Sequence, residues 1–126
     1  MEKERRILAV DDDESILNVL SRFLKPLGYA LAIASSGAEA LEIIRRQPPD
    51  LILLDINMPG IDGLEVLRQA RQLIPAVPVI MVTGSDDAEV AKQAMALGAV
   101  DYVTKPFDLG YLEDSIKANL ASGQKE

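Results

Sequence analysis

The sequence contains no cysteine and no histidine. Without cysteine there can be no disulfide, thiolate zinc site or cysteine nucleophile, and the chain fits a reducing compartment. Without histidine there can be no Ser-His-Asp triad, no imidazole metal ligand and no internal phosphohistidine. Any chemistry must therefore rest on carboxylates, hydroxyls, lysines and the backbone.

Long apolar runs are missing as well. No run approaches the roughly 20 residues that span a bilayer, and the apolar stretch after the charged N-terminus is too short for a signal peptide. We therefore expect a cytoplasmic location without membrane attachment. The net charge of −7 disfavours direct binding of nucleic acid or anionic lipid by this domain.

The 126 residues suffice for one domain with a hydrophobic core but not for two ordinary ones. A composition of 48% hydrophobic and 26% charged residues is that of a folded globular chain. We expect the domain to occupy residues 1–121. Residues 122–126 are expected to form a tail or the start of a linker.

Short apolar runs alternate with amphipathic stretches that repeat apolar residues at helical spacing. Strict alternation predicts parallel strands with right-handed crossovers and helices on both faces of the sheet. The expected fold is therefore α/β, a flavodoxin-like (βα)5 three-layer sandwich whose five-stranded sheet has the order 2-1-3-4-5. The second and fifth runs are less apolar and suit the sheet edges. The expected strands are Ile7–Val10, Ala30–Ala34, Leu51–Leu54, Val77–Val82 and Ala99–Val103.

Local signals mark several helix ends. Ser36–Glu39 and Asp62–Glu65 have the form of a capping box, and Asp13–Glu14 is expected to cap the first helix. Glycines at positions 28 and 98 stand where helices should end. Asp101, by contrast, is read equally well as a solvated charge or as part of a partner face.

Carboxylates follow the two strands that flank the topological switch point, where ligands bind in such sheets. The first strand ends in Asp11 and Asp12, and the third ends in Asp55. Carboxylates packed together repel each other, and Mg²⁺, with Mn²⁺ as a substitute, would relieve this repulsion through oxygen ligands. The backbone carbonyl of Asn57 is a further candidate ligand.

The fourth and fifth strands supply complementary groups at the same edge. Thr83 offers a hydroxyl and Lys105 offers an ammonium. A strand-end lysine is usually solvated, but one beside an acidic cluster is expected to pair with it. Phosphoryl transfer requires such positioned groups, which neutralise charge on the phosphoryl oxygens. An aspartate can serve as its nucleophile, giving an aspartyl phosphate.

Four blocks of the sequence resemble the receiver domain of bacterial two-component response regulators. They occur in the order of that family and lie between residues 6 and 120. The resemblance implies a phosphoacceptor signalling domain that is not an enzyme in the ordinary sense. The blocks are Ile7–Glu14, Leu51–Leu64, Val79–Gly84 and Gly98–Phe107.

The resemblance also assigns roles. Asp55 would be the phosphoacceptor, and Asp12, Asp55 and the Asn57 carbonyl would bind Mg²⁺, with Asp11 helping directly or through water. Thr83 would hydrogen-bond a phosphoryl oxygen, and Lys105 would pair with the phosphoryl group. The remaining roles concern the switch: Tyr102 would change rotamer with Thr83, and the Lys105–Pro106 peptide would be cis, aiming the lysine inward.

Partners follow from the same resemblance. A sensor histidine kinase or a phosphotransfer protein would supply the phosphoryl group, because this chain has no histidine. The face made by the fourth helix, fifth strand and fifth helix would change affinity for an output domain or protein, with transcription regulation as one output, and could form a homodimer. Two alternatives stay open: a degenerate receiver that acts as a phosphorylation-independent docking module, and a small metal-dependent phosphohydrolase.

Overall fold

A computed structural model describes residues 4–123. Its strands form one parallel sheet of order β2-β1-β3-β4-β5. The predicted α/β class and strand order are therefore confirmed, and the two less apolar strands lie at the edges as expected. The elements are β1 (Arg6–Val10), α1 (Glu14–Leu24), the 3-10 turn η1 (Lys25–Leu27), β2 (Ala30–Ala34), α2 (Gly37–Arg46), β3 (Leu51–Leu54), α3 (Gly63–Leu73), β4 (Val79–Thr83), α4 (Ala88–Ala96), β5 (Asp101–Thr104) and α5 (Leu109–Gly123).

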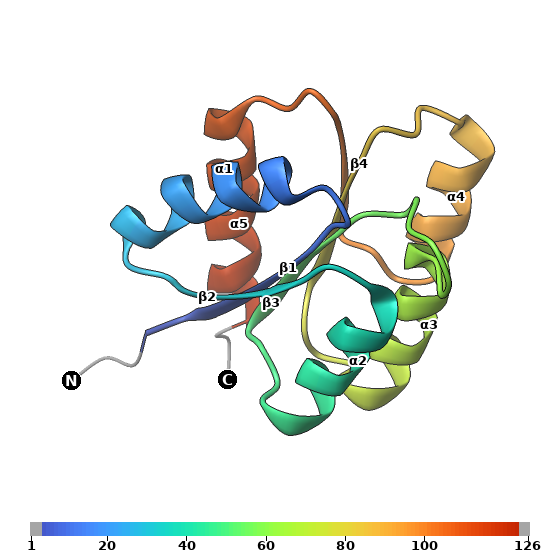
Figure 1. Ribbon diagram of the computed structural model, residues 1–126, viewed down its shortest axis with the longest axis horizontal. Helices are drawn as coiled ribbons and strands as arrows, with labels where there is room; N and C mark the ends of the chain where they lie inside the picture. Colours follow the sequence, from blue (N-terminus) through green and yellow to red (C-terminus); the bar gives the residue numbers. More distant parts are fainter. Residues whose placement is uncertain (1–3, 124–126) are drawn as a thin grey trace.

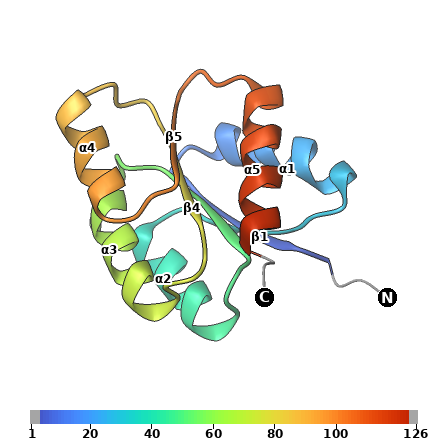
Figure 2. The ribbon, with the colours of Figure 1, turned by 180° about the vertical axis from the view of Figure 1, so that it is seen from behind.

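The helices form two layers, one on each face of the sheet (Figures 1 and 2). Helices α1 and α5 lie together on one face, and α2, α3 and α4 lie on the other. Side chains alternate along the central strand, so Leu51 and Leu53 pack on the α1 and α5 side while Ile52 and Leu54 pack on the opposite side. Both faces of β3 are thus buried, as its unbroken apolar sequence predicts.

Helix α4 is the least embedded of the helices within the described residues. Ala94 is its one fully buried residue, with Val90 and Leu97 partly buried against the same core cluster. Few apolar contacts hold this helix to the sheet, so its displacement costs less than that of α1 or α3.

The N-termini of α2 and α3 agree in part with the capping boxes predicted from the sequence. Ser36 and Asp62 cap α2 and α3 through the N–H groups of Glu39 and Glu65. The second hydrogen bond of each expected capping box, from the backbone N–H of the N-cap residue to the glutamate side chain, does not form in α2 or α3. Glu39 instead accepts hydrogen bonds from Ser35, and Glu65 binds side chains further along α3.

Three strands differ from their predicted ranges: β1 begins one residue earlier, at Arg6, and β4 and β5 each begin two residues later and end one residue later than expected. The fourth strand begins at Val79, because Pro78 has no N–H to contribute to a ladder. The fifth begins at Asp101, because the N–H of Ala99 bonds to the carbonyl of Ala94 at the end of α4. Helix α5 continues to Gly123, two residues into the segment expected as tail or linker, and residues 124–126 lie outside the described residues. Within the described chain, no helix has both the length and the apolarity to cross a bilayer.

The first turn of α3 lies directly against the end of β3. The N–H of Gly63 donates to the carbonyl of Ile56 at 2.8 Å. A Cβ at position 63 would clash with the carbonyl oxygen of Asp55 and lie 2.6 Å from Cα of Ile56. Glycine is therefore required here so that the helix can support the backbone that carries Asp55.

Gly63→Ala is expected to lower the free energy of unfolding by about 2 kcal/mol, because the added methyl group forces two backbone segments apart. Urea denaturation followed by circular dichroism measures this loss. Gly84→Ala is the matched control, since a Cβ there has nothing within 4 Å, and its effect is expected to stay within about 0.5 kcal/mol. Equal losses in the two variants would show that the close approach at Gly63 is unimportant.

Candidate functional site

The sheet ladders bring the acidic strand ends together. Past the ends of the strands, the N–H of Asp55 bonds to the carbonyl of Val10 and the N–H of Asp11 bonds to the carbonyl of Ala34, both at 3.0 Å. Asp12 follows directly, and carboxylate oxygens of the three aspartates lie within 4.8 Å of one another. The predicted convergence at the carboxyl edge is therefore present in the structure.

The three carboxylates differ in exposure. Asp11 and Asp55 are 2% and 4% exposed, whereas Asp12 faces solvent. Burial raises the pKa of Asp11, and hydrogen bonds from Lys105 and from the N–H of Asp13 offset this only in part. Oδ1 of Asp55 is buried and has no hydrogen-bond partner among the described residues. An unpartnered buried carboxylate oxygen is costly unless a ligand satisfies it.

Lys105 reaches the acidic cluster from the end of β5. Its Nζ lies 2.7 Å from Oδ2 of Asp11 and 3.6 Å from Oδ2 of Asp55. Burial lowers the pKa of Lys105, but the hydrogen bond to Asp11 and the charges of the neighbouring carboxylates outweigh burial and leave this pKa raised. The Lys105–Pro106 peptide is cis, as the resemblance implied. The expected pairing of this lysine with the acidic edge is thus observed.

Asp13 belongs to a different local structure. Its carboxylate accepts a hydrogen bond from the N–H of Ser15 and caps α1. Its hydrogen bonds to Ser15 lower its pKa. The side chain is a helix cap, as expected from its place after the first strand.

Thr83 and Tyr102 are connected through the loop after β4. Thr83 is fully buried, and its Oγ1 accepts a hydrogen bond of 3.3 Å from the N–H of Ser85. Tyr102 is half-buried, and its hydroxyl donates to the carbonyl of Ser85 at 2.9 Å. Asn57 lies in the loop after β3, exposed between buried Ile56 and Met58. The roles of these residues toward a phosphoryl group stay predictions.

The structure also contains a polar cluster that the sequence did not reveal. The carboxylate of Asp101 accepts hydrogen bonds from the N–H of Tyr102 and from the hydroxyls of Tyr111 and Ser115. Tyr111 and Ser115 are four residues apart and so share one face of α5. The sequence shows this spacing, but only the packing of α5 against β5 brings the two hydroxyls to Asp101.

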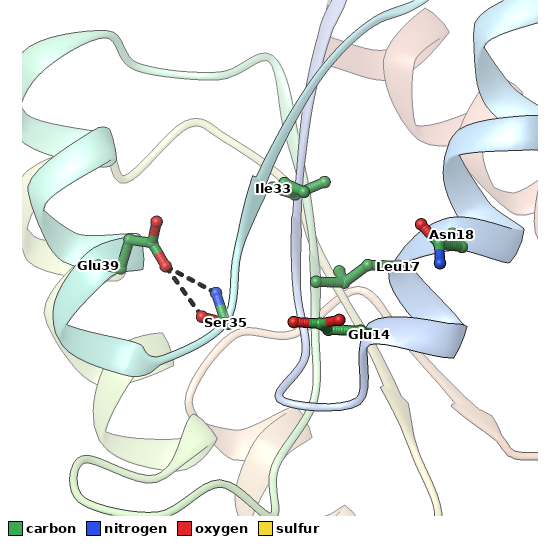
Figure 3. A pocket seen from close by; sticks show the side chains of 6 residues that line it. All are labelled: Glu14, Leu17, Asn18, Ile33, Ser35 and Glu39. Carbon is green, nitrogen blue, oxygen red and sulfur yellow. Dashed lines mark hydrogen bonds between the residues drawn. The ribbon is translucent and has the colours of Figure 1, made fainter.

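A groove borders the acidic edge between α1 and the end of β2 (Figure 3). Leu17 and Ile33 provide its apolar surface, with Glu14 near one side. Glu39 lies across from it and holds Ser35 by hydrogen bonds. The groove therefore combines an apolar centre with acidic margins beside the carboxylate cluster.

The described fold and acidic edge define the class of protein: an α/β domain with carboxylates and a lysine at the switch point of its sheet. The family model of the response regulator receiver domain matches residues 7–117. The chain therefore belongs to the response regulator receiver domain family, whose members are signalling domains.

Individual relatives agree with this membership. The chain is 41% identical over 115 residues to the transcriptional regulatory protein ZraR of Escherichia coli K12, covering 91% of this chain and 26% of that protein. It is 43% identical over 115 residues to the response regulator MprA of Mycobacterium leprae, covering 91% of this chain and 50% of that protein. The chain thus spans only a quarter to a half of these curated relatives, both of them regulators.

Solved structures resemble the whole domain. A CheY-like response regulator receiver domain protein from Methanospirillum hungatei JF-1 superposes with a TM-score of 0.94 at 35% sequence identity. The match covers 97% of this chain and 98% of that one. The fold is therefore that of a receiver domain.

Proposed function

We propose that Asp55 accepts a phosphoryl group from the phosphohistidine of a sensor histidine kinase or phosphotransfer protein, in a reaction that depends on Mg²⁺ or Mn²⁺. The observation that carries this proposal is the environment of Asp55. Its carboxylate is buried beside two other aspartates, one of its oxygens has no hydrogen-bond partner among residues 4–123, and Lys105 lies beside the other oxygen. Such a site is arranged to hold an anion and a cation together.

The residues present fit a magnesium ion. Mg²⁺ prefers oxygen ligands, uses few carboxylates and keeps several waters. Asp11, Asp12 and Asp55 present oxygens within 4.8 Å of one another, and the carbonyl of Asn57 is the fourth ligand that we propose. When bound, the cation would neutralise charge on the phosphoryl oxygens and draw the carboxylates together.

The protein's own groups would perform the transfer. An oxygen of Asp55 attacks phosphorus in line, the new P–O bond forms as the P–N bond breaks, and the donor's ring nitrogen keeps the electron pair. The ammonium of Lys105 balances charge on a phosphoryl oxygen. The hydroxyl of Thr83 donates a hydrogen bond to another. The modified side chain carries roughly two negative charges near pH 7.

The switch would follow from these contacts. In moving to donate to the phosphoryl group, the Thr83 hydroxyl would leave the N–H of Ser85, whose carbonyl also accepts from the hydroxyl of Tyr102. The surface formed by α4, β5 and α5 then changes its affinity for a partner. Phosphorylation acts only through its differential stabilisation of this second arrangement.

The proposed partners of that surface are an output domain or protein, or a second copy of the chain. Relatives of this chain include transcriptional regulators, so control of transcription is the output that we propose. The phosphoryl donor must approach the carboxyl edge of the sheet, which the groove of Figure 3 borders.

Acetyl phosphate with Mg²⁺, followed by intact-protein mass spectrometry, tests the proposal. We expect a mass gain of one phosphoryl group that hydroxylamine removes, as it does from an acyl phosphate, and that EDTA prevents. No mass gain would contradict the proposal. Multiple-turnover hydrolysis of small phosphate esters would instead favour a phosphohydrolase, and failure to bind Mg²⁺ in a calorimetric titration would favour a docking module.

A further inference from the structure

A polar cluster joins the edge strand β5 to helix α5. We call Asp101, Tyr111 and Ser115 the Asp101 cluster. Oδ2 of Asp101 accepts hydrogen bonds from the hydroxyls of Tyr111 at 2.8 Å and Ser115 at 2.7 Å. Oδ1 accepts a third, of 2.7 Å, from the N–H of Tyr102. Hydrogen bonds to an ionised acceptor are among the stronger ones in proteins, so this cluster fixes the relative position of the two elements.

The cluster connects opposite faces of the sheet. The Tyr102 side chain packs with the core cluster on the α4 side, whereas its neighbour Val103 packs on the α5 side. Asp101 likewise points to the α5 side, since its carboxylate meets two residues of α5. The same carboxylate holds the backbone of Tyr102. A change in Tyr102 on one face is therefore mechanically linked to α5 on the other.

Hydrogen bonds connect Thr83, at the carboxyl end of β4, to this cluster. Thr83 accepts from the N–H of Ser85, and the carbonyl of Ser85 accepts from the hydroxyl of Tyr102. The N–H of Tyr102 then donates to Asp101, which holds Tyr111. Tyr111 is 52% exposed, so the path ends on the surface of the protein.

We propose that the Asp101 cluster is a positioning device that makes the α5 surface at Tyr111 respond to the phosphoryl state of Asp55. This inference rests on the proposed function and adds the residues through which α5 takes part. Coupling between two sites is reciprocal. The cluster therefore also sets how readily Thr83 and Tyr102 adopt the phosphorylated arrangement.

Fluorine NMR of protein labelled with 3-fluorotyrosine tests the path directly. The chain has three tyrosines, and phenylalanine variants assign their resonances. With Mg²⁺ and beryllofluoride, a phosphoryl analogue, the Tyr102 and Tyr111 resonances of the wild type are expected to shift. The Tyr29 resonance is expected to stay, because that residue precedes β2 and takes no part in the hydrogen bonds of the Asp101 cluster.

Variants of the Asp101 cluster distinguish a role in transmitting the phosphoryl state from a role in stability alone. In Ser115→Ala, and in Asp101→Asn, Tyr102 is expected still to shift at saturating beryllofluoride, while Tyr111 loses most of its shift. Tyr111→Phe is expected to change the affinity for beryllofluoride about fivefold, a common size for coupling between sites. Tyr29→Phe is the matched control and should leave that affinity unchanged. The effect of Tyr111→Phe should vanish in a Tyr102→Phe background, because the two residues act in one path.

Two failures can be told apart. If the wild type gains no phosphoryl group from acetyl phosphate, the proposed function is wrong, and this inference, which rests on it, is wrong as well. If the wild type is phosphorylated and Tyr102 shifts while Tyr111 does not, the inference alone is overturned. Cluster variants that lower the unfolding temperature but leave the Tyr111 response and the beryllofluoride affinity unchanged overturn it as well.

Discussion

An Asp55→Asn protein is expected to gain no phosphoryl group from acetyl phosphate and Mg²⁺, even after prolonged incubation. The amide has the shape of the carboxylate and fits the same buried space, but it lacks the ionised oxygen that attacks phosphorus. It also removes one of the three clustered carboxylates. Intact-protein mass spectrometry over time, beside the wild type, measures the effect. A mass gain in the variant would place the phosphoacceptor elsewhere.

The same substitution is expected to stabilise the metal-free fold by about 1 kcal/mol, as functional residues often cost stability. The physical reason is the removal of a buried charge next to Asp11, whose oxygens lie close to those of Asp55. Urea unfolding in EDTA measures the change. Asp114→Asn, at an exposed position of α5, is the control and should stay within about 0.5 kcal/mol. A less stable Asp55→Asn protein in EDTA would show that repulsion is unimportant here.

Lys105→Met is expected to slow phosphorylation by acetyl phosphate about a hundredfold, the effect of losing one preorganised group that stabilises developing charge. Methionine keeps most of the apolar stem of lysine but removes the ammonium that contacts Asp11 and Asp55. Rates of mass gain at fixed Mg²⁺ concentration measure the loss. The modified residue should still be Asp55, because the nucleophile is intact.

Lys117→Met provides the matched control for this substitution. Nζ of Lys117 pairs with Glu113 on the surface of α5, where its side chain is 60% exposed. Such exposed pairs contribute little, so the phosphorylation rate should equal that of the wild type. A Lys105→Met protein that reacts as fast as the Lys117→Met protein would remove Lys105 from the transfer step.

The fold was predictable because two independent patterns agree. Apolar runs set the strands, and the amphipathic stretches between them require crossovers on both faces. The convergence of Asp11, Asp12 and Asp55 followed from topology alone, since the carboxyl ends of neighbouring parallel strands must meet. Lys105 was predictable for the same reason, as it follows the last strand of the same sheet.

Contacts that depend on side-chain direction were not predictable. The Glu39 side chain satisfies Ser35 and not the N-cap residue Ser36, a choice between neighbours that spacing cannot distinguish. The sequence left Asp101 open between a solvated charge and part of a partner face, and its hydrogen-bond partners Tyr111 and Ser115 lie 10 and 14 residues further along. Only the docking of α5 against an edge strand turns those three residues into one cluster.

Helix α4 has one fully buried residue in the described chain, Ala94. Most positions of this helix are therefore not constrained by packing against the core. Substitutions at exposed helix positions usually change stability by no more than about 0.5 kcal/mol. The outward residues of α4 can therefore be exchanged with little loss of stability, so the partner surface that we propose can vary without a change at the carboxylate edge. The proposed recognition surface and the proposed chemistry thus place separate requirements on the sequence of one small domain.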